Sequence, residues 1–256
     1  MPNWVKNKIT IIDDDYLKII KSVINKDEEL DFNKLIPMPK SLEISSGTTS
    51  DTCARLYVNS FMEDCEAFAK YLKLYKQGDF HRDWKMSEEE IQEDFKLLIS
   101  QDERPNCTDN FKTKADVYSR GKQVLDNIGK YGFKDWYDWS IANWGTKWNA
   151  CESFVENNSI YFDTAWDPVP IIVEKLSKKF PTAKIHYDYA EEQLCVCCGE
   201  MDFENGQIVN MQKFEFGSKE AYDKAFELWG GKEFFKYDKK TKTYKFKDNQ
   251  SDEGME

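Results

Sequence analysis

The residues with the clearest chemical potential are three clustered cysteines, Cys195, Cys197 and Cys198, with His186 shortly before them in the sequence. Thiolate and imidazole groups can hold a metal ion or form a nucleophile and its base. Zinc sites usually take ligands two to four residues apart in two pairs, and a single C-x-C-C motif leaves the coordination shell incomplete. If 194–201 is a strand, Cys195 and Cys197 share one face and Cys198 lies on the other. We therefore expect buried free cysteines, with metal binding and nucleophilic catalysis as the alternatives.

Few other residues suit acid–base catalysis. His81 lies in a polar loop, and neither histidine stands beside a serine or cysteine in a nucleophile motif. His186 alternates with apolar residues, which is typical of a packed or surface strand histidine. Asp163 and Asp167 flank a predicted strand-to-helix junction, where Asp167 followed by Pro168 suits a helix cap. The sequence also has neither familiar phosphate-binding glycine motif, so we expect no catalytic residue, no cofactor and no metal.

An unusual density of tryptophan marks the segment 136–150, WYDWSIANWGTKWNA. Its first two indoles are three residues apart, on one face of a short predicted helix that ends near Gly145. The residues after the helix alternate as in a strand. Each indole can bury about 150–250 Å², which favours a helix-to-strand corner fixed to the core. The alternative is an aromatic pocket for a base or a cation, formed by Trp136, Trp139, Trp144 and Trp148.

The elements that would position these groups follow from periodicity. Helical spacing predicts helices near 17–24, 54–75, 87–100, 115–131, 169–180 and 220–228, with a polar linker at 101–113. Alternation predicts strands at 4–12, 30–39, 148–156, 160–164, 184–190, 194–201 and 207–216, with a hairpin turn at 157–159 and another around 239–242.

This order of elements predicts an α+β fold. A β-α-β unit at the start and a β-α-β-β unit after residue 148 indicate a ferredoxin-like antiparallel sheet with helices on one face, interrupted by a helical insertion. The expected domains are a sandwich formed by 1–40 and 133–231, an insertion at 41–132, and a C-terminal hairpin with an acidic tail at 232–256.

Several segments in the same order resemble the YubB-like proteins of phages and plasmids. They are the MPNW start, FNKLIPMPKSL at 32–42, the tryptophan segment at 136–150, FDTAWDPVPIIVEKLSKKFP at 162–181 and YDYAEEQ at 187–193. The resemblance covers residues 1–42 and 133–206. It implies a ferredoxin-like fold and a mobile-element setting, in a family of unknown function that supplies no catalytic residues.

The charge and the cysteines limit the setting and the partners. A net charge of −11 opposes nonspecific binding to nucleic acid or anionic lipid and favours a basic protein partner. No window approaches eighteen apolar residues, so no membrane contact is expected. Seven irregularly spaced cysteines, and a start without a signal-peptide core, indicate the reducing cytoplasm of a bacterial host. The oligomeric state stays open.

Two features could nevertheless serve nucleic-acid binding. Tyr161 and Tyr187 are strand aromatics of the kind that stack on RNA bases in ferredoxin-like sheets. The segment 232–247 has seven lysines against one aspartate and one glutamate, a net +5, interleaved with aromatic residues. Lysines on an edge hairpin also prevent sheet-to-sheet aggregation, which is the structural alternative.

Together these observations predict a noncatalytic binding protein of a phage or other mobile element. It would act by occluding a host protein, such as a defence or nucleic-acid enzyme. The alternative is a nucleic-acid or nucleotide-binding module that uses the sheet face and the C-terminal lysines. The candidate binding residues are Trp136, Trp139, Trp144, Trp148, Tyr161, Tyr187, Lys239, Lys240 and Lys242.

Overall fold

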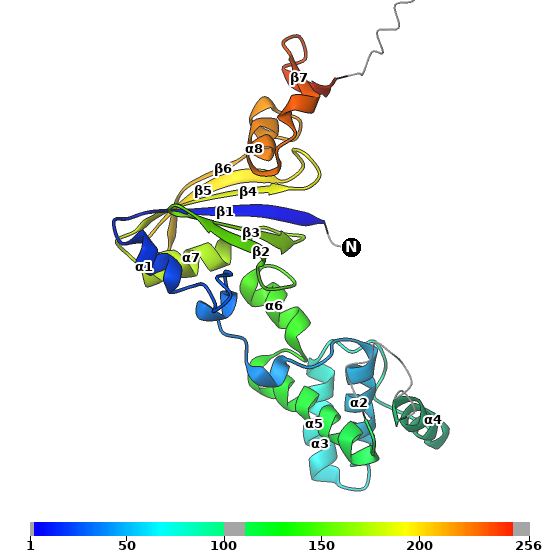
Figure 1. Ribbon diagram of the computed structural model, residues 1–256. Coiled ribbons are helices and arrows are strands. Elements are labelled where there is room, and N and C mark those ends of the chain that lie inside the picture. Colours follow the sequence, from blue (N-terminus) through cyan, green and yellow to red (C-terminus); the bar gives the residue numbers. More distant parts are fainter. Residues whose placement is uncertain (1–2, 100–110, 248–256) are drawn as a thin grey trace, which may run out of the picture. The chain divides into compact units, whose positions relative to one another are not determined.

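The computed structural model describes residues 3–99 and 111–247 (Figure 1). The chain divides into two compact units: Met1–Pro37 with Ile141–Glu256, called here the sheet unit, and Met38–Ser140, called the helical unit. Most of the polar linker predicted at 101–113, and the last residues of the predicted acidic tail, lie outside the described residues.

A six-stranded antiparallel sheet forms the centre of the sheet unit, in the order β2-β3-β1-β4-β5-β6. The strand β1 lies between β3 and β4, where Ile9 pairs with Ile160 on one side and with Tyr187 on the other. The first and later strands thus share one sheet, as predicted. The bounds are β1 Trp4–Ile12, β2 Cys151–Glu156, β3 Ser159–Ala165, β4 Lys184–Glu191, β5 Cys198–Glu204 and β6 Gln207–Lys213.

One face of the sheet is covered by α1 (Tyr16–Lys21) and α7 (Pro170–Lys179) (Figure 1). The chain passes from β3 through α7 to β4 and leaves β1 between them, which is the split β-α-β arrangement of ferredoxin-like folds. Apolar residues at helical spacing on α7, among them Ile172 and Leu176, are fully buried. The predicted α+β, ferredoxin-like class is confirmed for this unit.

The opposite face of the sheet also carries a helix, α8 (Lys219–Trp229). Successive strand residues point to opposite faces. On β4, the Tyr187 hydroxyl accepts a hydrogen bond from the Val169 N–H at the start of α7, whereas Asp188 binds Lys224 of α8. The helices therefore lie on both faces, although the sequence analysis placed them on one. Alternation shows that β4 is amphipathic, but it does not show which later helix covers its polar side.

Buried residues of β1 recur at every second position, and Asn7 is the polar member of this series. Asn7 is 1% exposed, and its amide donates to the Thr164 hydroxyl at 2.9 Å. Its carbonyl oxygen accepts from the Tyr187 hydroxyl. These bonds satisfy a polar group in the core, so the burial of Asn7 does not leave unpaired atoms.

The strand predicted at 30–39 is wrong. This segment contains one 3-10 helix, η1 (Phe32–Lys34), and a second, η2 (Lys40–Leu42), follows it directly. Its β-type pairing is a single isolated bridge between Leu30 and Ile24. Pro37 and Pro39 lack the N–H groups that a strand ladder needs. The apolar residues instead serve packing, because Phe32 meets the rings of Trp144 and Phe162 edge-on.

The helical unit contains α2 (Thr48–Asn59), α3 (Cys65–Gln77), α4 (Glu88–Ile99) and α5 (Lys114–Tyr131). The helix α6 (Trp136–Trp144) begins in this unit and ends in the sheet unit. A capping box begins α4, because Ser87 Oγ accepts from the Glu90 N–H and Glu90 accepts from the Ser87 N–H. Gly121 of α5 permits close packing on α2, since a Cβ there would lie 2.1 Å from the Cys53 carbonyl oxygen.

A two-stranded hairpin, β7 (Phe235–Asp238) and β8 (Thr243–Phe246), follows α8, as predicted. The short 3-10 helix η4 (Lys232–Phe234) precedes it. Phe226 of α8 contacts the rings of Phe235 and Tyr244, so the hairpin packs on α8. Within the described residues, none of the helices has the length and apolar character that crossing a bilayer requires.

The buried Tyr187 hydroxyl tests this account of the core. Tyr187→Phe removes the acceptor of the Val169 N–H and the donor to Asn7 Oδ1. We expect the free energy of unfolding of the sheet unit to fall by roughly 1–3 kcal/mol in urea denaturation, because two buried polar atoms lose their partner. Tyr161→Phe, on a partly exposed ring, is the control and should change it by less than about 0.5 kcal/mol. Equal effects of the two substitutions would contradict this assignment.

Candidate functional site

The face of the sheet that carries α8 presents a row of charged side chains, which we call the polar face. It is formed by Lys6 and Lys8 of β1, Asp163 of β3, His186 and Asp188 of β4, Glu200 and Asp202 of β5, and Lys224 and Glu227 of α8. The register places His186 opposite Asp202, and Asp188 opposite Glu200. Residues of one parity on neighbouring strands thus meet on one face.

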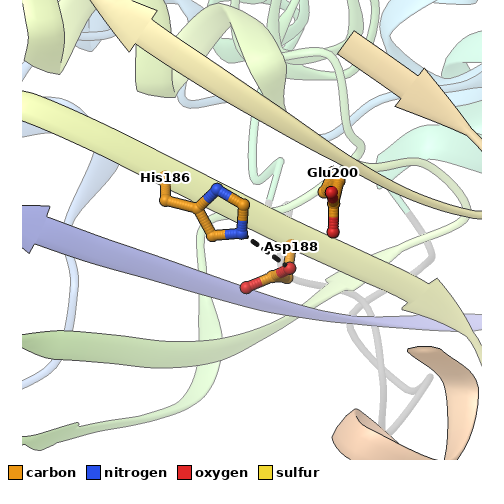
Figure 2. Close-up of side chains that lie close together, drawn as sticks. All are labelled: His186, Asp188 and Glu200. Atoms are coloured by element: carbon orange, nitrogen blue, oxygen red, sulfur yellow. Dashed lines mark hydrogen bonds and ion pairs between the residues drawn. The ribbon is translucent and has the colours of Figure 1, made fainter. Parts of the chain in front are cut away.

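His186 is hydrogen-bonded to the carboxylates of Asp188 and Asp202, and Figure 2 shows the bond to Asp188. Its Nε2 is 3.1 Å from Asp188 Oδ1, and its Nδ1 is 2.6 Å from Asp202 Oδ1. The hydrogen bond to Asp188 is the main cause that raises the pKa of His186 to about 9; burial opposes this effect and the bond to Asp202 adds to it. With both nitrogens donating, the ring is an imidazolium at neutral pH. It therefore lacks the free lone pair that a general base needs.

Lys224 supplies the second cation of the polar face. Its ammonium group binds Asp188, lies 3.1 Å from Glu200 Oε2 and 3.2 Å from Glu227 Oε2. Burial alone would lower the pKa of Lys224, but the hydrogen bond and charge of Asp188 outweigh burial and raise it. Burial likewise pushes the pKa of Asp188 upward, and the bonds from His186 and Lys224 reverse the direction, so that it falls below its usual value. Asp188 is consequently a buried anion shared by two cations.

The same cluster has the residue types of a metal site, and its geometry speaks against one. Ligand atoms of His186, Asp188 and Glu200 lie within 4.8 Å of one another. However, the Lys224 ammonium already binds both Asp188 and Glu200. A divalent cation would have to displace a lysine and deprotonate an imidazolium, each at an electrostatic cost. The arrangement is better explained as an ion-pair network that holds α8 on the sheet.

An aromatic pair borders the polar face at the β2 edge. The rings of Phe154 and Tyr161 are stacked, with centroids 4.8 Å apart and planes 5° apart. The Lys8 ammonium lies 5.8 Å from the Tyr161 ring centre. Phe154 is 54% exposed, so this edge offers an accessible apolar ring beside paired charges. Such a combination is typical of a contact surface for a macromolecule.

The structure separates the other predicted binding residues. Tyr187 is fully buried beneath α7, so its assignment to a binding surface is wrong; it faces the opposite side of the sheet from Tyr161. Lys239, Lys240 and Lys242 are exposed at the tip of the hairpin. They lie in the turn that joins β7 and β8, and these two strands form a sheet separate from the six-stranded one.

The tryptophans of the segment 136–150 have different surroundings. Trp139 and Trp144 are 6% and 4% exposed, so neither is available as a binding surface. The Trp144 indole donates to the Ile36 carbonyl oxygen at 2.9 Å. Trp148 packs against Trp4, and Trp136 against Tyr137, and both are half-buried. Core packing was the favoured interpretation of this segment, and burial accounts for Trp139 and Trp144.

The cysteines are free but do not lie on one strand as predicted. Cys195 is in a turn with φ 61°, and β5 begins only at Cys198, because the chain between β4 and β5 makes a longer turn than alternation indicates. Burial raises the pKa of the Cys197 thiol and raises that of Cys198 to about 11. Raised pKa values disfavour the thiolate, so these thiols are poor nucleophiles.

The two aspartates of the strand-to-helix junction are also not a catalytic pair. Burial raises the pKa of Asp163, whose carboxylate is 3.6 Å from Lys6. Asp167 is not a helix cap as predicted, because α7 has Val169 as its N-cap and Pro170 at its first turn. The Asp167 carbonyl oxygen instead accepts from the Thr164 hydroxyl, and the turn includes Trp166 with φ 73°.

Sequence reasoning missed the network around Asp188. A signal was present, because His186 and Asp188 on one strand, and Glu200 and Asp202 on the next, repeat the same spacing. Each pair indicates a polar strand face. Only the register of β4 and β5 brings the pairs together, and α8 adds Lys224 from a distant segment.

Comparisons with known proteins give a family match within the sheet unit and a structural match over most of the chain. Residues 143–232 match the family model described as the ferredoxin-like domain in Api92-like protein. The chain is also similar to a crystal structure of a protein api92 from Yersinia pseudotuberculosis, with 11% sequence identity and a TM-score of 0.40 over 84% of this chain and 99% of that chain. No curated protein matches the chain. The family model supports the ferredoxin-like fold and names Api92-like proteins, not the YubB-like proteins of the sequence resemblance.

The pKa of His186 leads to a pH prediction. Because its pKa rises from 6.5 in an unstructured chain to about 9 in the fold, protonated His186 stabilises the folded state. This stabilisation is complete below pH 6.5 and disappears as the pH rises through about 9. We expect the free energy of unfolding of the sheet unit to drop by roughly 1–3 kcal/mol over this window, and His186→Gln to abolish that drop. An imidazole that titrates in NMR near its ordinary pKa would contradict the prediction.

Proposed function

We propose that the protein is a noncatalytic binding protein that acts by occluding a partner protein. In this proposal the chain is YubB-like and belongs to a phage or other mobile element, and its partner is a host protein in the bacterial cytoplasm, such as a defence or nucleic-acid enzyme. The support for the setting is the sequence resemblance at residues 1–42 and 133–206.

The observation that carries the noncatalytic proposal is the closure of the ion-pair network on the polar face. Both ring nitrogens of His186 are hydrogen-bonded, one to Asp188 and one to Asp202, and Lys224 is surrounded by carboxylates. Groups that are bound to each other are not poised to exchange protons with a substrate. What remains accessible beside them is an apolar ring, Phe154, and apolar rings flanked by charge support association with a protein.

Charge supports a basic partner. The ion pairs of the polar face join four cationic groups, Lys6, Lys8, His186 and Lys224, to five carboxylates, Asp163, Asp188, Glu200, Asp202 and Glu227. The face is therefore slightly acidic, within a chain of net charge −11. Complementary charge accelerates encounter and selects the partner, while the aromatic edge supplies buried apolar area.

This proposal predicts that binding depends on the aromatic edge. Phe154→Ser removes the exposed ring and should weaken the binding of a purified host partner at least about tenfold in a titration, since central aromatic residues often dominate interface energy. The matched control is Phe216→Ser, which changes a residue that is 71% exposed and lies outside the polar face. The proposal fails if no host protein binds the wild type above background, or if both variants bind it equally.

The alternative function, nucleic-acid binding, is favoured by one specific feature of the hairpin. Lysines of both strands and of the connecting turn surround the half-buried Tyr237 and the 64% exposed Phe246. Of the basic residues here, Lys245 is neutralised by Asp238. Cations beside aromatic rings suit single-stranded nucleic acid, which offers phosphates and unstacked bases.

The alternative predicts salt-dependent binding through the hairpin tip. The triple variant Lys239→Gln, Lys240→Gln, Lys242→Gln should weaken binding to a single-stranded oligonucleotide. It should also flatten the dependence of log K on log salt by about 0.7 for each phosphate that the protein no longer neutralises. The control removes three exposed lysines of α3, Lys70, Lys73 and Lys76, and keeps the same net charge as the test variant. Binding that is undetectable at low salt, or equal in both variants, would rule the alternative out.

A further inference from the structure

The strand β6 (Gln207–Lys213) offers a surface that the binding proposals do not use. It is the last strand in the order of the six-stranded sheet, so within the described residues it pairs with β5 alone. Every residue of β6 is exposed, and three of them are large and apolar: Ile208, Val209 and Met211, which are 48%, 55% and 54% exposed. An exposed sheet edge with apolar side chains is a ready surface for pairing with another strand.

The two edges of this sheet differ in how they are protected. The opposite edge strand, β2, carries Glu152 and Glu156, and its ladder to β3 is interrupted. β6 has one charged residue, Lys213, at its end. Its ladder to β5 is regular from Asn210 to Lys213 and shifts register just before this segment. Charges and irregularities on an edge strand prevent pairing with other chains, so the regular part of β6 is the less protected edge.

The direction of the backbone groups of β6 follows from its pairing with β5. The Phe214 N–H donates to the Cys198 carbonyl oxygen at 3.1 Å, which makes these two residues a hydrogen-bonded pair. Hydrogen-bonded and non-hydrogen-bonded pairs alternate along an antiparallel ladder. Gln212 therefore directs its N–H and C=O toward β5, whereas Met211 and Lys213 direct theirs away from the sheet. These outward groups point to where a further strand would lie.

We propose that the protein forms a symmetric dimer in which β6 pairs antiparallel with β6 of a second copy, about a two-fold axis at Met211. The outward backbone groups of the two Met211 residues form a hydrogen-bonded pair, and their side chains meet on one face of the sheet. On the other face, Asn210 of each copy lies across from Gln212 of the other. At each end Val209 lies across from Lys213, so no two like charges face each other.

The sequence of β6 suits a second copy of itself. The Asn210 amide nitrogen donates to Asp202 Oδ2 at 3.0 Å, which leaves its carbonyl oxygen to accept from the Gln212 amide of the second copy. The aliphatic stem of Lys213 covers the apolar Val209. A two-fold axis makes each contact twice and closes the assembly at two chains, because both β6 edges are then paired. The contact is narrow, so we expect a weak dimer.

Substitution of Val209 tests the pairing by the sign of its effect. Val209→Glu places a carboxylate opposite Lys213 at both ends of the interface, and Val209→Lys places a second cation there. We expect sedimentation equilibrium of the full chain to give a dimer dissociation constant between about 10 μM and 1 mM for the wild type. The constant should fall at least about threefold in Val209→Glu and rise at least about threefold in Val209→Lys. Net charge alone acts in the opposite direction, because the chain is acidic.

Ile12 provides the matched control. It is 56% exposed at the end of β1, and Val209 is 55% exposed, so both positions tolerate polar side chains in the fold. Ile12→Glu should weaken the dimer slightly and Ile12→Lys should strengthen it slightly, through net charge alone. Met211→Lys sets two cations at the axis and should abolish association, with folding checked by circular dichroism. Phe154→Ser changes the opposite edge and should leave the dissociation constant unchanged, which separates this proposal from the function proposed above.

Three results would overturn the proposal. A wild type that stays monomeric up to about 1 mM would leave the β6 edge to a segment of another protein. A shift of the dissociation constant in the same direction in Val209→Glu and Val209→Lys would show that Val209 does not lie across from Lys213. An association that persists in folded Met211→Lys would place the contact elsewhere on the chain.

Discussion

The structure of the sheet unit depends on how the charge of one buried carboxylate, that of Asp188, is compensated. Asp188 is 1% exposed on β4, and an isolated anion at such a position would be driven to protonate. Two cations prevent this: His186 from the same strand and Lys224 from α8. Because Lys224 must approach Asp188, the anion also decides where α8 lies. Removing one partner leaves a buried charge uncompensated, which is far more destabilising than never having had the pair.

The same constraint shapes the surface beside it. α8 contacts β1 through the ion pair of Lys8 with Glu227 and through the Lys6 ammonium over the Trp229 ring. The polar residues of the strand are therefore already engaged by the helix and are not free to bind a ligand. On the other face, alternate residues of the same strands pack under α7 around the satisfied Asn7. β1 and β4 thus have helices against both faces, with apolar contacts on the α7 side and ion pairs on the α8 side.

Periodicity was sufficient where an element has one apolar face and one polar face. The alternation of β1 and the helical spacing of α5 were both predicted, because each pattern is visible in neighbouring residues of the sequence. Predictions failed where a distant segment decides. The apolar residues after Leu30 fit a strand pattern, but their role is packing, because Phe32 contacts the rings of Trp144 and Phe162. Cys195 was predicted on a strand, but it lies in the turn before β5, which is longer than the alternation indicates. A single sequence also does not show the register between strands, so the pairing of His186 with Asp202 could not be predicted.

Two polar clusters of the chain, one around Asp188 and one around Arg55 and Asp51, differ in whether all their buried polar atoms have hydrogen-bond partners. Around Asp188 every donor has an acceptor, and a network in that state resists exchange with solutes because any ligand must break existing bonds. Around Arg55 and Asp51 the buried atoms Arg55 Nη1 and Asp51 Oδ2 have no hydrogen-bond partner among the described residues, although the rest of each side chain is fixed. Buried polar atoms without partners cost free energy, which the packing around them must offset. The network around Asp188 thus holds α8 on the sheet with its hydrogen bonds complete, whereas the helical unit tolerates Arg55 Nη1 and Asp51 Oδ2 as buried atoms without partners among the described residues.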